Sequence, residues 1–368
     1  MDKMMIMVVD GCAPEYLTRE TAPGLYALAG KLGFMKTVKS AIPSVTNVNH
    51  ACILSGRFPK DTGVVGNYYY KPETGEEGFI EERGFMQAET ILQAYKKAGK
   101  TTALLTVKGK VLGVYGDGAD TGISVQTPDP EVLKRLGLSQ PPKVQSPEST
   151  RWILEAALAC VKTEDPDLLY CTTNDYVFHH WGPGTAEAEE QIHWLDEYIC
   201  RIHQADPERR IYITADHGMN QKRHLINFQA MADRRGIRLY CLPPLKDRYI
   251  ENHIYQEGGI LYVFLKNEEE REAFLELAQS TPEIERVMES SQAAEAFHLP
   301  AGRIGDYVLL AAEDCAFGEV EGERLNTEAV RTHGSLYEQE IPLWTVHPQA
   351  SPERYQYSKD IAAIAMGI

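Results

Sequence analysis

Four short apolar runs, each ended abruptly by polar residues, constrain the fold of this chain more than any other feature of its sequence. A short, continuous apolar run that stops at a turn signal is typical of a strand buried on both faces in a parallel sheet. The four runs are Met4–Val9, Thr101–Val107, Asp167–Thr172 and Ile211–Ala215. We therefore predict that these segments are core strands of a parallel sheet.

Helical patterns lie between these predicted strands, at Glu89–Ala98, Glu148–Val161 and Ala186–His203. Alternating strands and helices imply right-handed crossovers, which give a mostly parallel sheet with helices on both faces. The expected fold class is therefore α/β, a three-layer sandwich with a mostly parallel central sheet. In such a fold the polar residues that directly follow the strands lie along one edge, where open α/β sheets place their sites.

The character of the chain changes from about residue 224 to residue 330. A helical pattern near Glu268–Gln279 occurs there among strand-like segments, which are Ile260–Leu265, Ile284–Met288 and Tyr307–Ala311. After this stretch, Ile341–Val346 returns to the pattern of a core strand. We predict that residues 1–223 and 331–368 form the α/β core. Residues 224–330 would form a small α+β cap insertion over the site.

The formal net charge of −16 limits the partners of the chain. A chain this acidic repels nucleic acid and anionic membranes, so we expect neither, and an anionic ligand must be attracted by local cations. No apolar stretch reaches the length of a membrane span, and Met4–Val9 is too short for a signal-peptide core, so the cytoplasm is the expected compartment. The seven cysteines form no C-x-x-C pair, which favours reduced thiols over disulfides or a thiolate zinc site. The sequence leaves open whether the chain forms a homodimer.

Aspartates and histidines from widely separated segments gather at the predicted site, several of them directly after strands. They are Asp10, Asp175, His179, Asp216, His217 and His333. Mixed carboxylate and imidazole ligands suit zinc or other divalent first-row metals. Each residue alone is more often structural, but burying three carboxylates at one edge is costly unless cations pair with them. The set therefore predicts a metal site.

A second feature is the segment Thr46–Ser55, which has the pattern of a helix led in by Pro43 and Ser44. Thr46 would lie in its first turn, where free N–H groups and the helix dipole favour an anion. On this stretch alone, an N-cap role for Thr46 is the simpler interpretation.

The order of these motifs resembles the nucleotide pyrophosphatase and phosphonoacetate hydrolase branch of the alkaline phosphatase superfamily. The ordered set of six ligand candidates and one threonine carries the resemblance, because any single motif is common. The matching stretches are Val9–Gly11, Pro43–Asn49, Ser55–Pro59, Gly63–Asn67, Asp175–His179, Asp216–Met219 and His333–Gly334. The resemblance covers most of the chain outside the predicted cap and implies an alkaline-phosphatase-like sandwich.

The resemblance also implies two divalent metal ions per chain, for which Zn²⁺ is the expected identity. In this family Asp, His and His hold one ion, and here they correspond to Asp175, His179 and His333. Asp, Asp, His and the nucleophile hold the other, and they correspond to Asp10, Asp216, His217 and Thr46. Thr46 would then be the catalytic nucleophile, and the phosphothreonine that it forms would be hydrolysed by water.

Three further stretches resemble the phosphonoacetate hydrolases of that branch, namely Gly66–Tyr70, Lys108-Gly109-Lys110 and Thr332–Ser335. They imply a small anionic organophosphorus substrate, phosphonoacetate, whose contacts would be Thr46, Asn67, Lys108, Lys110 and His179. Cleavage of the C–P bond to acetate and phosphate sends electrons toward the carboxylate, where two ammonium groups would oppose the growing charge. Without the resemblance, two solvated loop lysines would be the simpler interpretation.

Other functions stay open at this point. A phosphodiesterase or nucleotide pyrophosphatase would use the same metals, and Tyr68, Tyr69 and Tyr70 could supply an aromatic shelf for a base. His50 after Asn49 also follows the nucleotide pyrophosphatase pattern. A non-catalytic metal sensor is disfavoured by the intact nucleophile and ligand set. Phosphoglycerate mutases, which use serine, and sulfatases, which need a modified Cys or Ser, fit less well.

Overall fold

The computed structural model describes residues 2–247 and 256–368 and contains a seven-stranded central sheet. Its order is β2 (Met35–Lys39), β16 (Glu340–Val346), β8 (Arg210–Thr214), β1 (Met4–Val8), β7 (Leu168–Thr172), β5 (Thr102–Thr106) and β6 (Thr121–Ser124). Strands β8, β1, β7, β5 and β6 pair in parallel, whereas β16 runs antiparallel to both of its neighbours. The predicted mostly parallel sheet is therefore confirmed, with the four predicted strands adjacent at its centre.

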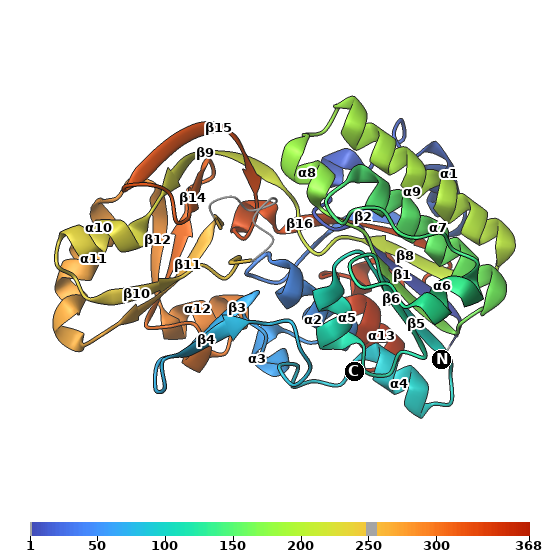
Figure 1. Cartoon of the computed structure of the whole chain (residues 1–368), viewed down its shortest axis with the longest axis horizontal. Coiled ribbons are helices and arrows are strands. Elements are labelled where there is room, and N and C mark those ends of the chain that lie inside the picture. Colours follow the sequence, from blue (N-terminus) through green and yellow to red (C-terminus); the bar gives the residue numbers. More distant parts are fainter. Residues whose placement is uncertain (1, 248–255) are drawn as a thin grey trace.

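Helices cover both faces of this sheet, as predicted (Figure 1). One group packs around α9 and consists of α1 (Pro23–Leu32), α6 (Pro130–Leu136), α7 (Pro147–Thr163), α8 (Tyr176–His180) and α9 (Ala186–Ala205). The other consists of α2 (Thr46–Ser55), α3 (Pro59–Thr62), α4 (Ile91–Lys97), α5 (Gly109–Tyr115) and α13 (Asp360–Met366). Helix α4 begins later than predicted, because Thr90 and Gln93 form a capping box at its N-terminus.

A second lobe lies beside the core, on the left in Figure 1. Its antiparallel sheet has the order β10 (Leu239–Leu242), β11 (Ile260–Leu265), β13 (Tyr307–Ala311) and β12 (Ile284–Glu289). Its helices are α10 (Phe228–Arg234), α11 (Arg271–Ser280) and α12 (Ser290–Phe297). Apolar clusters cover both faces of this sheet, and one of them also includes Ile42, Val65 and Tyr68 of the core sequence.

The connection between core and cap is a three-stranded sheet of β14 (Cys315–Phe317), β9 (Asn220–Ile226) and β15 (Arg324–Thr332). The predicted cap boundaries at residues 224 and 330 fall inside β9 and β15, and residues 248–255 of the predicted cap lie outside the described residues. A hairpin of β3 (Tyr68–Lys71) and β4 (Glu76–Phe79) extends from the core sequence and contacts the cap. Within the described parts of the chain, no helix is both long and apolar enough to cross a bilayer.

Candidate functional site

The ends of the central strands bring the predicted ligands together in the interior. Asp10 follows β1, Asp175 follows β7, and Asp216 with His217 follows β8, while His333 follows β15 of the connecting sheet. All five side chains are almost completely buried. Their ligand atoms form two groups in which every pair lies within 4.8 Å: Asp10, Asp216 and His217, and Asp175, His217 and His333.

His217 lies at the centre of this arrangement. Its Nε2 atom is 3.4 Å from Asp10 Oδ1 and 3.4 Å from Asp216 Oδ2, and its ring stacks on His333 at 3.4 Å between centroids. His179 joins the cluster through Asp175, whose Oδ2 is 3.3 Å from His179 Nε2. All six predicted ligands are therefore neighbours, and His217 lies within reach of both groups.

The hydrogen bonds of the three histidines determine which ring nitrogen faces the cluster. Nδ1 of His179, His217 and His333 lies 2.6–2.8 Å from the backbone oxygens of Arg331, Gly218 and Ser44, respectively. A carbonyl oxygen can only accept, so each Nδ1 carries a proton, and Nε2 is the nitrogen whose lone pair each ring can offer to a cation. This is the tautomer that metal-ligating histidines adopt when the other nitrogen donates to the protein.

Electrostatics favour cations here as well. Burial and the neighbouring Asp10 carboxylate raise the pKa of Asp216 to about 7. Burial lowers the pKa of His217, but Asp216 and Asp10 outweigh it and raise that pKa to about 9. Asp216 Oδ2 is buried without a hydrogen-bond donor. The donor set and the charge both suit divalent cations, so the residues present fit a metal centre.

Thr46 is the first residue of α2, and its Oγ1 is 3.4 Å from His217 Nε2. The N-cap of α2 is Val45, so Thr46 does not have the capping role that its local sequence suggested. The hydroxyl lies instead between the positive end of a helix dipole and the ligand cluster. Asn67 is nearby, because its Oδ1 accepts from the backbone N–H of Asn47 at 3.3 Å.

The two predicted lysines are buried rather than solvated. Lys108 Nζ lies 2.9 Å from Asp10 Oδ2 and 2.7 Å from Asp175 Oδ2, so it contacts carboxylates of both ligand groups. Burial lowers the pKa of Lys108, but these two carboxylates outweigh it and raise it above its ordinary value. Lys110 Nζ contacts Asp247 Oδ2 at 2.5 Å, and the sequence had suggested no role for Asp247.

A buried polar network holds the histidine loops in place. Ser44 Oγ donates to Ser335 O at 2.8 Å and accepts from Gly334 N at 3.1 Å, which fixes the loop that carries His333. Glu338 accepts from the backbone and hydroxyl of Ser335, and its own backbone oxygen accepts from Gly218 N at 2.8 Å. Glu338 therefore fixes two loops, the one that follows Asp216 and the one that precedes β16.

That residue is in turn held by a buried ion pair. Lys222 Nζ lies 2.8 Å from Glu338 Oε1, and neither side chain is exposed to solvent. Asn220 Nδ2 donates to the same oxygen at 3.0 Å.

His50 is a second residue whose role the sequence did not reveal. It lies one helical turn after Thr46, and its Nδ1 is 2.6 Å from the Tyr170 hydroxyl. Its Nε2 is 4.0 Å from Asp216 Oδ2. Burial lowers the pKa of His50 to about 3, so the ring is neutral. The sequence offered two signals, the Asn49-His50 pattern of the nucleotide pyrophosphatases and the spacing of four residues from Thr46, which places both side chains on the same helix face.

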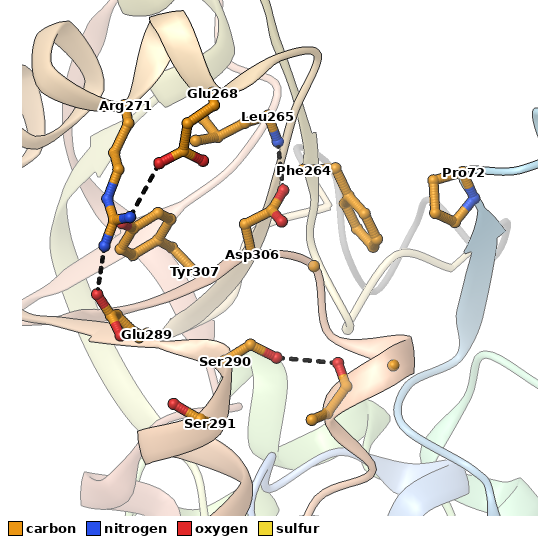
Figure 2. A pocket seen from close by; sticks show the side chains of 13 residues that line it. Pro72, Phe264, Leu265, Glu268, Arg271, Glu289, Ser290, Ser291, Asp306 and Tyr307 are labelled. Carbon is orange, nitrogen blue, oxygen red and sulfur yellow. Dashed lines mark hydrogen bonds and ion pairs between the residues drawn. The ribbon is translucent and has the colours of Figure 1, made fainter.

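A cavity of about 650 Å³ in the cap is not part of this cluster (Figure 2). Its polar groups satisfy one another: Arg271 pairs with Glu268 and Glu289, and the Asp306 carboxylate accepts from Leu265 N. None of the predicted site residues lines it. The buried cluster at the strand ends is therefore the candidate functional site.

Comparison with known proteins agrees with this location. The family model described as type I phosphodiesterase / nucleotide pyrophosphatase matches residues 4–336. An ectonucleotide pyrophosphatase/phosphodiesterase of Caenorhabditis elegans is 26% identical over 246 residues, 64% of this chain and 31% of that protein. Human ectonucleotide pyrophosphatase/phosphodiesterase family member 1 is 22% identical over 260 residues, 66% of this chain and 27% of that protein. The chain thus spans less than a third of the length of these curated relatives.

Among solved structures, phosphonoacetate hydrolase from Sinorhizobium meliloti 1021 in complex with phosphonoacetate superposes with a TM-score of 0.88 at 28% identity. This match covers 100% of the present chain and 95% of the other. Murine ectonucleotide pyrophosphatase / phosphodiesterase 5, inactive and in complex with AMP, superposes with a TM-score of 0.71 at 17% identity, covering 100% and 94%. At that identity the second match shows the shared fold alone.

Proposed function

Because this chain belongs to the type I phosphodiesterase and nucleotide pyrophosphatase family, within the alkaline phosphatase superfamily, we propose that it hydrolyses phosphonoacetate. The C–P bond is cleaved to give acetate and phosphate through a phosphothreonine at Thr46. Two Zn²⁺ ions are the proposed cofactors, held by Asp175, His179 and His333 and by Asp10, Asp216, His217 and Thr46.

The observation that carries this proposal is the pair of buried lysines beside the ligand cluster. Lys108 contacts Asp10 and Asp175 directly, and Lys110 follows two residues later, as the second residue of α5. A phosphonate whose leaving group ends in a carboxylate benefits from ammonium groups there, because negative charge grows on that carboxylate as the bond breaks. The full-length similarity to a phosphonoacetate hydrolase supports the same substrate.

In the proposed reaction, Thr46 gives up its hydroxyl proton to solvent, and Oγ1 forms a bond to phosphorus while the P–C bond breaks. The electron pair passes to the carbon and is delocalised over the carboxylate, and protonation of that carbon gives acetate. Asn67 binds a phosphoryl oxygen through an N–H of its amide, and Lys108 and Lys110 bind the carboxylate. Water then cleaves the phosphothreonine, releasing phosphate and restoring the hydroxyl. When bound, the divalent cations would supply Lewis-acid stabilisation of the phosphoryl charge and make the hydroxyl more acidic.

A second candidate is a phosphodiesterase or nucleotide pyrophosphatase activity, favoured by the family model and the curated relatives. The proposed aromatic shelf is engaged with other side chains in this chain. Tyr70 packs on Tyr240 and Phe264, and Lys246 lies 4.8 Å from the centre of the Tyr68 ring. These contacts make the hairpin a weaker platform for a nucleobase.

The test compares wild type with Lys108→Ala and Lys110→Ala on phosphonoacetate and on an activated aryl phosphate, at saturating Zn²⁺. Each variant should lose about 1.5–3 kcal/mol of transition-state stabilisation on phosphonoacetate, the range for a charged hydrogen bond, and little on the aryl ester. Lys96→Ala, which removes an exposed lysine paired with Asp120, is the matched control. Equal losses on both substrates would assign the lysines a structural role, and nucleotide ester turnover without phosphonoacetate cleavage would favour the second candidate.

A further inference from the structure

The cap segment Pro243–Asp247 directly follows β10. It contacts two of the proposed substrate-binding residues, Asn67 and Lys110. Pro244 O accepts from the backbone N–H of Asn67 at 2.7 Å. Leu245 O accepts from Asn67 Nδ2 at 3.2 Å. A Cβ at Gly66 would lie 2.9 Å from Pro244 O, so this close approach needs glycine there. The segment therefore sets the position of Asn67.

These bonds also determine what Asn67 can offer a ligand. Its Oδ1 accepts from Asn47 N, and one hydrogen of Nδ2 is donated to Leu245 O. An amide nitrogen has two hydrogens, so one remains for an additional acceptor. The orientation of the amide is thus fixed jointly by the nucleophile helix and by the cap.

The same segment ends at Asp247, whose carboxylate contacts the Lys110 ammonium at 2.5 Å. The exposed fractions are only 3% for the Lys110 side chain and 5% for that of Asp247. Burying an ion pair adds little stability compared with apolar residues of similar size, because desolvation offsets the attraction. Stabilisation of the fold is therefore a poor explanation for two charges at this place.

We propose that Asp247 is the positioning residue that orients Lys110 from the cap and thereby sets the selectivity of the site for leaving groups that end in a carboxylate. The inference rests on the proposed function and specifies its substrate recognition. An ammonium has three N–H donors, and the one directed to Asp247 leaves two for the oxygens of a carboxylate. Pairing with Asp247 also offsets the positive charge of Lys110. The contribution of Lys110 to binding a carboxylate therefore depends more on the direction of its N–H groups than on net electrostatic attraction.

A double-mutant cycle tests this with Lys110→Ala, Asp247→Ala and the variant that carries both changes. On phosphonoacetate each single change should lower kcat/KM by about 10- to 100-fold, the effect of losing a charged hydrogen bond. The double variant should be no worse than Lys110→Ala, because Asp247 acts through that lysine. Turnover of an activated aryl phosphate should change little in any of the three.

Two further variants separate positioning from folding. Asp247→Asn keeps an acceptor for the ammonium without its charge, so it should recover much of the phosphonoacetate activity that Asp247→Ala loses. Glu319→Gln is the matched control, since it removes a carboxylate that pairs with Lys246 of the same segment and does not contact Lys110. Multiplicative losses in the double variant, or equal losses on both substrates, would overturn the inference.

Binding measurements test the role of Asp247 independently of whether the proposed reaction takes place. If wild type does not cleave phosphonoacetate, the proposed reaction fails, and calorimetric dissociation constants decide the role of Asp247. The Zn²⁺-loaded wild type should bind phosphonoacetate more tightly than inorganic phosphate, and this advantage should shrink by the same factor in Asp247→Ala and Lys110→Ala. No advantage in wild type, or one that persists in Asp247→Ala, would overturn the inference.

Discussion

Glu338 offers a sharp test of how the fold supports the site, because one side chain fixes two ligand loops. Its Oε1 accepts from Lys222 Nζ and Asn220 Nδ2, and its Oε2 accepts from the hydroxyl and N–H of Ser335. In Glu338→Gln, one of these oxygens becomes an NH₂ group that faces donors. The substitution therefore leaves donors unsatisfied on one side and an unneutralised ammonium on Lys222.

The size of the effect follows from burial. Neither side chain of the Lys222–Glu338 pair is exposed, and removing one partner of a buried pair costs about 3–5 kcal/mol. Glu338→Gln should lose that much free energy of unfolding, measured by urea denaturation. Because Gly218 directly follows His217 and Ser335 lies two residues after His333, Zn²⁺ affinity should also fall by about 10- to 100-fold in chelator competition, as for other residues that hydrogen-bond around metal ligands.

A matched control is Glu340→Gln, which changes an exposed glutamate at the start of β16. Glu340→Gln should change neither the free energy of unfolding nor the Zn²⁺ affinity appreciably, since surface substitutions usually shift stability by less than about 0.5 kcal/mol. A loss below about 1 kcal/mol in Glu338→Gln, together with unchanged Zn²⁺ affinity, would refute the idea that this residue organises the two loops.

Three further predictions concern the site itself. Thr46→Ala should lower kcat by about a thousandfold or more while Thr46→Ser keeps part of the activity, and near-normal rates in Thr46→Ala would place the nucleophile elsewhere. Metal analysis after mild purification should find about two divalent ions per chain, and full activity in a verified metal-free sample would contradict the two-metal assignment. Burial lowers the pKa of His50 from 6.5 to about 3, so between these values the unfolded chain binds more protons and stability falls with falling pH. In His50→Gln, the unfolding free energy should fall less steeply over this pH range than in wild type. Identical pH slopes of the unfolding free energy in the two proteins would show that His50 does not cause the fall.

The sequence predicted the central architecture well, because buried parallel strands leave a distinctive pattern. Strands β1, β5, β7 and β8 lie where their apolar runs indicated. The edge strand β2 gave no such signal, since three of the five residues in Met35–Lys39 are polar and only Val38 is fully buried. Strand β9 contains several charged residues, and the burial of Lys222 within it depends on a partner that lies far away in the chain.

The same limit applies to the candidate site. Strand ends and the family resemblance indicated the six candidate ligands, and the structure places five of them in two groups that share His217, with His179 beside Asp175. The partner of Lys110 could not be predicted, because Asp247 is 137 residues away and belongs to the cap. Local spacing also could not show that Lys108 would contact two ligand carboxylates, since that contact depends on how β1, β5 and β7 align in the sheet.

The most direct test of the central claim is product analysis with purified, Zn²⁺-loaded protein and phosphonoacetate. Acetate, followed by NMR, and inorganic phosphate, followed colorimetrically, should appear in equal amounts and at equal rates, and neither should form with Thr46→Ala. Absence of both products with wild type, or phosphate release without acetate, would contradict C–P bond hydrolysis at this site.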